Sequence, residues 1–293
     1  MFSFINKNQT TIKKILKEIA PFLNEIKINN LFKQKDIKIN GIRIKDNATV
    51  LVGDKVEIFF DFEKYLQSIL KTIYEDDNII VVDKIQGIET TSEDINRYTL
   101  ETYLSKCYDY CRAVHRLDLN TKGLVIFAKN EMAYNELYNA IKSHQIKKTY
   151  KAIVFSLNAP KVKKYINNIY EDKSNNISII TDKNSDKEAI LEIVHSSKIN
   201  NELYEIEINL ITGRMHQIRA QLAHNKMFVL GDGRYGDSEI NTKYKINKQL
   251  LKAVQIEFNF ANNSELNYLN NKKISTTFEY TLKDIKWVNL QKN

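Results

Sequence analysis

The sequence predicts an α+β protein whose larger part is built on a mixed, largely antiparallel sheet, with a small α/β domain ahead of it. The first observation is that apolar, strand-like segments dominate after residue 76, while helical patterns are scattered. The second is a change in the hydrophobic pattern along the chain. A helix–helix–hairpin pattern fills residues 1–60, a connector spans 61–75, and the larger part covers 76–293. With 293 residues, 43% of them apolar, both parts can bury a core.

Residues 1–60 contain two short helical patterns and a hairpin. Apolar residues recur at helical spacing over 12–23 and again over 28–35. Alternating isoleucines then flank Asn40-Gly41, a strong hairpin signal, and a turn at Gly53-Asp54 leads into another strand. This order resembles the S4 RNA-binding domain, and a generic small α/β module with a solvated basic face is the alternative.

Positive charge is concentrated in the same part of the chain. The whole chain has a formal charge of +8, and residues 1–60 hold eleven Lys or Arg against six Asp or Glu. Five of the eight excess positive charges therefore lie in about a fifth of the chain, which suits a polyanion such as RNA. The resemblance implies that this domain grips RNA phosphates, and the candidate side chains are those of Lys33, Lys35, Lys38, Arg43 and Lys45.

The connector over 61–75 contains neither Pro nor Gly, which predicts a helical or packed segment rather than a flexible linker. Beyond it, the pattern predicts strands at 78–84, 125–130, 150–155, 189–197 and 204–211, helices at 95–110 and 131–142, and exposed hairpins or loops over 161–187.

Several function classes find no support in the composition. No apolar run approaches the roughly 20 residues that span a bilayer, and the first residues lack the pattern of a secretory signal. Two cysteines, Cys107 and Cys111, give no disulfide framework. We therefore expect a cytoplasmic, monomeric protein that does not bind membranes.

The stretch AVHRLDLNTKGLVIFAKN, residues 113–130, places polar residues directly ahead of a glycine and a strand. Its only carboxylate, Asp118, could cap a surface turn or could be a positioned reagent. A second polar segment, ITGRMHQIRAQLA at 211–223, is followed by LGDGRYG at 230–236. With IIVVDKIQG at 79–87 and KKTYKAIV at 147–154, these motifs resemble, in order, those of the RluA-type RNA pseudouridine synthases.

The resemblance implies a reaction and its residues. Pseudouridine formation detaches uracil from C1′ of its ribose and rejoins it through C5, which requires a nucleophile or base but no redox change. The resemblance makes Asp118 the catalytic aspartate, pairs it with Arg219, and lays Tyr150 against the base. A bidentate arginine–carboxylate pair would orient Asp118 and keep it ionised. Ile218 and Leu222 would form apolar walls around the uracil.

Other motif members receive supporting roles by resemblance. Arg116 would help to flip the uridine out of its stack or hold a phosphate, unless it is only a surface salt-bridge partner. We expect His115 and His216 to orient loops rather than to move protons. The remaining supporting residues of the two motifs are Thr121, Gly123, Gly213, Arg214 and Gln217.

Two further patterns imitate known sites. Gly231, Gly233 and Gly236 satisfy G-x-G-x-x-G, but the polar stretch DSEINTKYK that follows lacks a helical apolar stripe, so we expect no nucleotide cofactor. Cys107, Cys111 and His115 are spaced by four and could line one helix face. No fourth metal ligand is evident, so we interpret the cysteines as buried free thiols and expect no metal.

The sequence departs from the family pattern at several places. The turn at 84–87 lacks proline, and further differences are Lys122, Met215, Gln221 and an unusual C-terminal stretch FEYTLKDIKWV, residues 278–288. These bear on substrate choice, because Asp118, Tyr150 and Arg219 remain.

The resemblance thus implies an enzyme that isomerises flipped-out uridines in structured RNA without a cofactor, with large-subunit ribosomal RNA as the expected substrate. Transfer RNA is the alternative substrate. A non-catalytic RNA-binding or ribosome-assembly factor stays open, as does a phosphodiester hydrolase with Asp118 as general base. A hydrolase usually needs a second carboxylate, a metal cluster or a histidine pair that the motifs do not supply.

Overall fold

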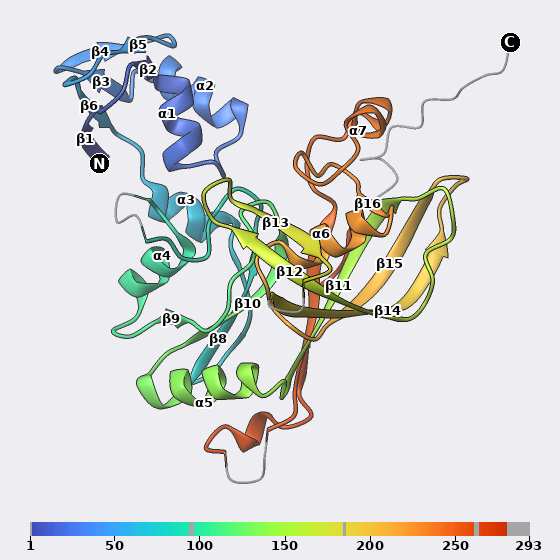
Figure 1. The fold of residues 1–293 in the computed structure, drawn as a ribbon. Helices are drawn as coiled ribbons and strands as arrows, with labels where there is room; N and C mark the ends of the chain where they lie inside the picture. The colour runs from blue at the N-terminus through green and yellow to red at the C-terminus, as the bar shows by residue number, and fades with distance from the viewer. Residues whose placement is uncertain (1, 94–96, 184–185, 261–263, 280–293) are drawn as a thin grey trace, which may run out of the picture.

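The structure, a computed structural model, describes residues 2–93, 97–183, 186–260 and 264–279. Residues 2–60 form a unit that we call the N-terminal module, with a four-stranded antiparallel sheet in the order β1-β6-β3-β4 and a short β2–β5 ladder (Figure 1). Its elements are β1 Phe2–Ile5, β2 Thr10–Thr11, α1 Ile12–Ile19, α2 Glu25–Lys33, β3 Ile37–Ile39, β4 Ile42–Ile44, β5 Thr49–Val50 and β6 Lys55–Ile58.

Local signals set the ends of these helices. The Thr11 side chain caps α1, which ends two residues before Pro21. The second helix begins at residue 25 rather than at the expected 28, because the side chain of Asn24 accepts a hydrogen bond from the Lys27 N–H. It ends at Lys33 rather than at Lys35, whose φ of 56° lies in the left-handed region. The expected range 28–35 was therefore displaced toward the C-terminus.

The predicted hairpin is present, with Asn40 and Gly41 at φ 49° and 81° between β3 and β4. The connector is the helix α3 Phe62–Ile69, followed by the strand β7 Lys71–Glu75. Because β7 pairs with β8 Ile79–Lys84, the second half of the connector belongs to the larger sheet.

Within the described residues, the larger sheet has twelve strands, nine of them in the order β13-β12-β14-β15-β11-β17-β10-β8-β7. All the pairings are antiparallel except that of β10 with β17, which confirms the predicted α+β class with a mixed, largely antiparallel sheet. The strands not yet bounded are β9 Arg112–Ala113, β10 Lys122–Ala128, β11 Ile146–Phe155, β12 Lys164–Asp172, β13 Ile177–Thr181, β14 Lys187–Lys198, β15 Leu203–Leu210, β16 Phe228–Val229, β17 Leu251–Phe258 and β18 Lys273–Ser275. The helices are α4 Leu100–Cys107, α5 Glu131–Lys142, α6 Gln217–His224, α7 Ser238–Tyr244 and the 3₁₀ turn η1 Asn267–Leu269.

Two expectations for this part need correction. The helix predicted over 95–110 is shorter, since α4 ends at Cys107, and residues 95 and 96 lie outside the described part. The stretch expected to be non-helical after Gly236 forms α7, because Asp237 caps the N–H groups of Glu239 and Ile240. The expected hairpins over 161–187 are β12 and β13, and the unusual C-terminal stretch lies mostly beyond the described residues.

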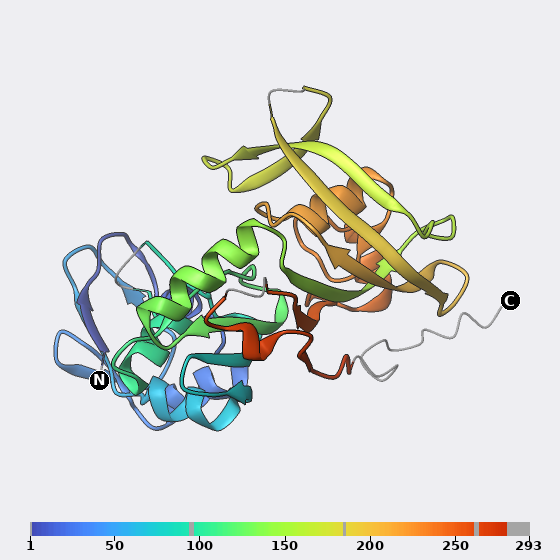
Figure 2. The ribbon, with the colours of Figure 1, turned by 90° about the horizontal axis from the view of Figure 1, so that it is seen from below.

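The central strands are buried on both faces. On one face, alternate residues of β8 and β10 such as Val82 and Val125 join a core cluster that continues into the N-terminal module. On the other face, Val81 and Ile126 pack beneath α5. Figure 2, seen from below, shows α5 lying over the sheet. The N-terminal module lies at one end of the sheet, and the β14–β15 loop extends away from the module. Leu117, in the segment that leads into β10, belongs to the core cluster that continues into the N-terminal module.

Candidate active site

Backbone contacts fix the loop that carries Asp118. The residue before it, Leu117, is 5% exposed, and its N–H donates to Oγ1 of Thr90 at 3.1 Å. The N–H of Thr121 closes a turn onto the carbonyl of Asp118 at 3.0 Å, and Oγ1 of Thr121 accepts from Gln249 at 2.8 Å. Leu117 therefore points inward, which leaves the Asp118 side chain free to face the other way.

Lys84 also binds the loop that carries Asp118. Its side chain is fully buried, and its Nζ donates to the carbonyls of Ile85, Ile88 and Leu119 at 2.9 to 3.2 Å. Burial lowers the pKa of Lys84 to about 7, and the negative charge of Asp118 opposes this effect. The lysine of the turn at 84–87 thus serves to fix the loop around Asp118.

The second motif forms a bend and the helix α6. His216 adopts φ 52° at the start of this helix. The side chain of Gln217 accepts from the Thr212 hydroxyl and the Arg214 N–H, both at 2.9 Å, and donates to the carbonyl of Ile190. This buried network fixes the bend, and Arg219, two residues further along α6, reaches Asp118.

Gln221 continues the network. Its amide nitrogen donates to Oδ1 of Asn167 at 2.9 Å and to the carbonyl of Ala189 at 3.0 Å, while its oxygen accepts from Gln217. This departure from the family pattern therefore ties α6 to strands β12 and β14.

Arg219 lies between two carboxylates. Its Nη1 is 2.9 Å from Oδ2 of Asp118, while its Nε and Nη2 bind both oxygens of Asp232 at 2.6 and 2.9 Å. The pair that the resemblance implied is present, but the bidentate geometry expected for Asp118 belongs to Asp232 instead. The side chains of Asp232 and Arg219 are 1% and 9% exposed, whereas that of Asp118 is 24% exposed. Asp118 is thus the carboxylate of this group that solvent or substrate can reach.

The charges in this group stabilise one another. Burial alone would lower the pKa of Arg219, but Asp232 and Asp118 outweigh it and raise that pKa above its ordinary value. Burial likewise opposes ionisation of Asp232, yet the Arg219 hydrogen bonds hold the pKa of that carboxyl below its ordinary value. The guanidinium is therefore permanently charged beside Asp118.

Tyr235 closes one side of the group. The guanidinium carbon of Arg219 lies 4.9 Å from the centre of its ring, a cation–π distance. The Tyr235 N–H donates to Asp232, and its hydroxyl lies 3.1 Å from Nδ1 of His216. The loop LGDGRYG therefore positions Arg219, with Gly231 and Gly236 packed closely on neighbouring backbone atoms.

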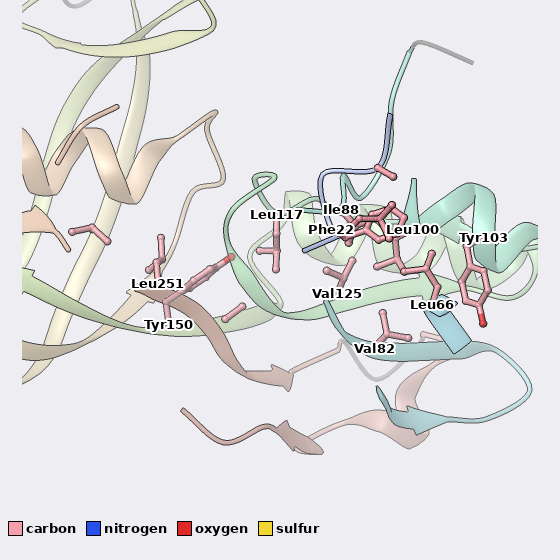
Figure 3. Close-up of a cluster of buried hydrophobic side chains, with 14 of the residues drawn as sticks. Phe22, Leu66, Val82, Ile88, Leu100, Tyr103, Leu117, Val125, Tyr150 and Leu251 are labelled. Carbon is pink, nitrogen blue, oxygen red and sulfur yellow. The ribbon is translucent and has the colours of Figure 1, made fainter. Parts of the chain in front are cut away.

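Tyr150 approaches from β11. Figure 3 shows its ring pointing from that strand toward the loop that carries Leu117, with Leu251 beside it. The ring is 4% exposed, and burial, with a contribution from Asp118, raises the pKa of its phenol. The expected apolar walls Ile218 and Leu222 belong to the same core cluster. In this conformation Tyr150 presents little surface for a base to stack on.

The other expected residues divide into exposed and structural ones. Arg116 is exposed, two residues from Asp118 on an extended segment. Nε2 of His115 accepts from the Ile126 N–H, and burial lowers its pKa to about 3, so this ring is neutral.

Gly123 allows β10 to approach β17, because a Cβ there would lie 2.1 Å from the Ala253 carbonyl oxygen. Nε of Arg214 donates to the carbonyl of Glu188.

Lys148 was not anticipated as a site residue. It shares the Tyr150 face of β11, and burial lowers its pKa to about 8. Its Nζ is 3.7 Å from where a Cβ of Gly213 would lie, an ordinary contact distance. Asp232 was missed as well, and the signal that could have found it is a carboxylate enclosed by glycines, which we assessed only as a nucleotide fingerprint.

The cysteines do not gather with histidine. Cys111 is buried, but Cys107 is exposed at the end of α4, so the expectation of two buried thiols was wrong for Cys107. No group of three His, Cys, Asp or Glu side chains that could hold a metal ion occurs among the described residues. None of the described helices is long and apolar enough to cross a membrane.

The basic candidates of the N-terminal module lie on its surface. Lys33 and Lys45 line a hollow of about 460 Å³ together with Lys13. Lys38 and Arg43 lie over the ring of Phe59 at 5.1 and 5.2 Å. Lys35 offers its carbonyl to Arg43, which ties the helix end to the hairpin.

Comparisons with known proteins identify the family of the chain. Residues 78–224 match the RNA pseudouridylate synthase family. The ribosomal large subunit pseudouridine synthase C of Rickettsia conorii is 32% identical over 255 residues, covering 78% of this chain and 83% of the relative. An uncharacterized RNA pseudouridine synthase of Mycoplasma capricolum is 33% identical over 298 residues, covering 92% and 95%. The solved structure of human RNA pseudouridylate synthase domain containing 4 shares the fold, with a TM-score of 0.58 at 17% identity over 76% of this chain and 93% of that one.

The site contains one accessible carboxylate held beside a buried guanidinium, and the matched residues include both of them. Together with relatives above 30% identity over most of the chain, this shows that the protein belongs to the RNA pseudouridylate synthase family and is an RNA pseudouridine synthase, an isomerase.

Proposed function

We propose that this enzyme converts uridines of large-subunit ribosomal RNA to pseudouridine, with Asp118 as the nucleophile. The observation that carries the proposal is the ion pair of Asp118 with Arg219, 101 residues apart in the chain, in which Asp118 is the accessible member. The choice of RNA rests on relatives such as the one from Rickettsia conorii, whose name specifies the large ribosomal subunit.

The chemistry needs one carboxylate. Attack of Asp118 at C1′ breaks the bond from C1′ to N1 and releases the uracil, which turns so that C5 faces C1′. The new C1′–C5 bond then displaces the carboxylate, C5 loses its proton and N1 gains one, so atoms and electrons balance. Arg219 orients Asp118 toward the bound nucleoside through a charge-assisted hydrogen bond from Nη1 to Oδ2.

Tyr150 acts as a neutral phenol. Burial and the Asp118 charge both raise its pKa, which disfavours a phenolate as the base that removes the C5 proton. A neutral phenol can lie against the uracil and relay a proton by donating one as it accepts another. Because Tyr150 is buried here, entry of the base requires the surrounding side chains to move.

RNA binding is divided between the two parts of the molecule. The exposed Arg116 occupies the space from which the uridine is flipped or holds its phosphate. The N-terminal module serves as an S4-like domain, in which Lys33, Lys35, Lys38, Arg43 and Lys45 contact phosphates.

Direct mapping of pseudouridine tests the choice of RNA. Unmodified transcripts of large-subunit ribosomal RNA and a pool of unmodified transfer RNA transcripts are incubated with the enzyme, and pseudouridine is located by chemical labelling. We expect modification at defined positions of the ribosomal transcript. Modification of the transfer RNA pool alone would overturn the substrate assignment, and RNA binding without modification of either would favour an assembly factor.

A further inference from the structure

Gly87 lies at a contact between the N-terminal module and the rest of the enzyme. It adopts φ +85°, and a Cβ there would lie 2.6 Å from the carbonyl oxygen of Pro21 and 2.8 Å from the nitrogen of Phe22. On its other side, the Gly87 N–H donates to the carbonyl of Leu119 at 2.9 Å. One residue therefore touches the loop between α1 and α2 and the loop that carries Asp118.

The surroundings of this contact form a shared apolar core. Phe22 packs edge-on against Phe62 of α3 and stacks on Tyr65, with ring centres 6.1 and 6.3 Å apart. Figure 3 shows Phe22 next to Ile88, which is fully buried, with Leu100 close by. Because one cluster of buried side chains runs through both units, the N-terminal module is docked on the catalytic part rather than tethered to it.

The turn at 84–87 is in turn bound to the Asp118 loop by side chains. Nε2 of Gln86 donates to the carbonyls of Asn120 and Gln249 at 2.8 and 2.7 Å. Nζ of Lys84 donates to the carbonyl of Leu119, as described above. These hydrogen bonds end on the carbonyls of residues 119 and 120 or on that of Gln249, which precedes β17.

Beside this contact lies a hollow of about 460 Å³, lined on the module side by Leu23 and Asn24 and on the catalytic side by Gln86 and Asn120. The turn can therefore shift into this space if an extra atom at residue 87 separates it from Pro21.

We propose that the Pro21–Phe22 contact on Gly87 is a positioning contact, by which the docked N-terminal module sets the position of the Asp118 loop. The module then has a second role besides binding RNA, since its place on the turn determines where the reactive carboxylate stands. The inference rests on the proposed role of Asp118.

The chain offers a matched pair of variants. Gly87→Ala adds a Cβ against Pro21, whereas Gly53→Ala adds one at nearly the same backbone angle, φ +89°, with no atom within 4 Å. Both changes carry the same local conformational cost, so their difference reports the contact. The measurements are amide hydrogen exchange of residues 117–121 in the free enzyme, and the single-turnover release of tritium from C5 of labelled uridine in an unmodified large-subunit ribosomal RNA transcript at saturating enzyme.

In Gly87→Ala we expect the Thr121 amide, which donates to Asp118, to exchange at least tenfold faster and the single-turnover rate to fall at least tenfold, with RNA affinity changed less than threefold. Gly53→Ala should leave all three values near those of the wild type. If Gly87→Ala does not fold, Phe22→Leu loosens the same contact without an added atom and should change the exchange and the rate in the same direction.

Unchanged exchange in the loop, or equal effects of both glycine variants, would overturn the inference. Faster exchange with an unchanged rate would overturn it too, provided that Asp118→Ala is inactive. If Asp118→Ala keeps its activity, the proposed function has failed instead, and the exchange data still decide whether the module holds the loop.

Discussion

At the scale of single residues, the account depends on how Arg219 divides its hydrogen bonds. The fork of the guanidinium binds the buried Asp232, which leaves Nη1 for Asp118. Asp232 also accepts the N–H groups of Arg234 and Tyr235, so its position is fixed by the loop. Arg219 is therefore anchored before substrate arrives, and Asp118 is oriented by a partner that does not have to reorganise.

Asp232→Asn removes one charge from this buried group. We expect it to lower the free energy of unfolding by about 3–5 kcal/mol, because the nearly buried Arg219 loses its bidentate partner. Urea unfolding measures this loss. Asp237→Asn, in the same loop, is the control, because asparagine caps the start of α7 about as well as aspartate does. A loss below about 1 kcal/mol in Asp232→Asn would contradict the anchoring role.

Sequence reasoning found the pair of Asp118 and Arg219 because both belong to long motifs of characteristic order. It did not find Asp232 or Lys84, whose roles consist of contacts with residues that are near in space only after folding. A lysine at the end of a strand carries no local mark of such contacts, and the carboxylate between glycines at residue 232 was assessed only as part of a nucleotide fingerprint. The expected bidentate bond was assigned to the wrong carboxylate for the same reason.

At the scale of elements, the parallel pairing of β10 with β17 brings the Asp118 loop to its place. Gly123, at the start of β10, has φ +116°, and a Cβ there would lie 2.1 Å from the carbonyl oxygen of Ala253 and 2.5 Å from its nitrogen. The two strands approach so closely that only glycine fits.

Gly123→Ala should separate these strands. We expect a loss of about 2 kcal/mol or more in the free energy of unfolding, from the clash and the strained backbone together. Thermal or urea unfolding gives the value, and Gly233→Ala, where a Cβ meets no atom within 4 Å, should lose much less. Equal free energies of unfolding of the two variants would contradict this prediction, because β17 would then have moved away from the added Cβ without loss of stability.

The elements that could be predicted are those with a strong local signal. The helix over 131–142 has clear periodicity and an Asn130 cap, and it was predicted with its observed ends. The hairpin at Asn40-Gly41 carries its own turn chemistry. In contrast, α7 depends on Ile240 packing against a distant cluster, and β7 depends on β8 as a partner. Neither dependence is visible in a window of sequence.

At the scale of the whole molecule, charge and architecture separate two tasks. The N-terminal module carries most of the excess positive charge, and the accessible carboxylate of Asp118 lies in the other part. Figure 1 shows the module on one side of the sheet and α5 at the far lower end. If the module grips phosphates, the salt dependence of RNA binding should change with its lysines and not with those of α5.

The double variant Lys33→Ala, Lys45→Ala removes two charges from the edge of the module's hollow. We expect the slope of log affinity against log salt to become shallower by about 1.4–1.8, which corresponds to two lost phosphate contacts. Filter binding to the ribosomal transcript between low and moderate salt measures it. The matched control, Lys142→Ala with Lys147→Ala, removes two exposed charges near the end of α5 and should leave the slope unchanged. Identical slopes in both double variants would place the phosphate contacts elsewhere.

The most direct test concerns the one carboxylate that substrate can reach. Asp118→Ala is compared with the wild type for tritium release from C5 of uridine in the unmodified ribosomal transcript and for affinity to the same RNA. A variant that binds within about threefold of the wild type and forms no pseudouridine is the result that this account predicts, because the proposed nucleophile is lost while the surfaces proposed to bind RNA remain. Pseudouridine formed by Asp118→Ala at the wild-type positions would contradict it.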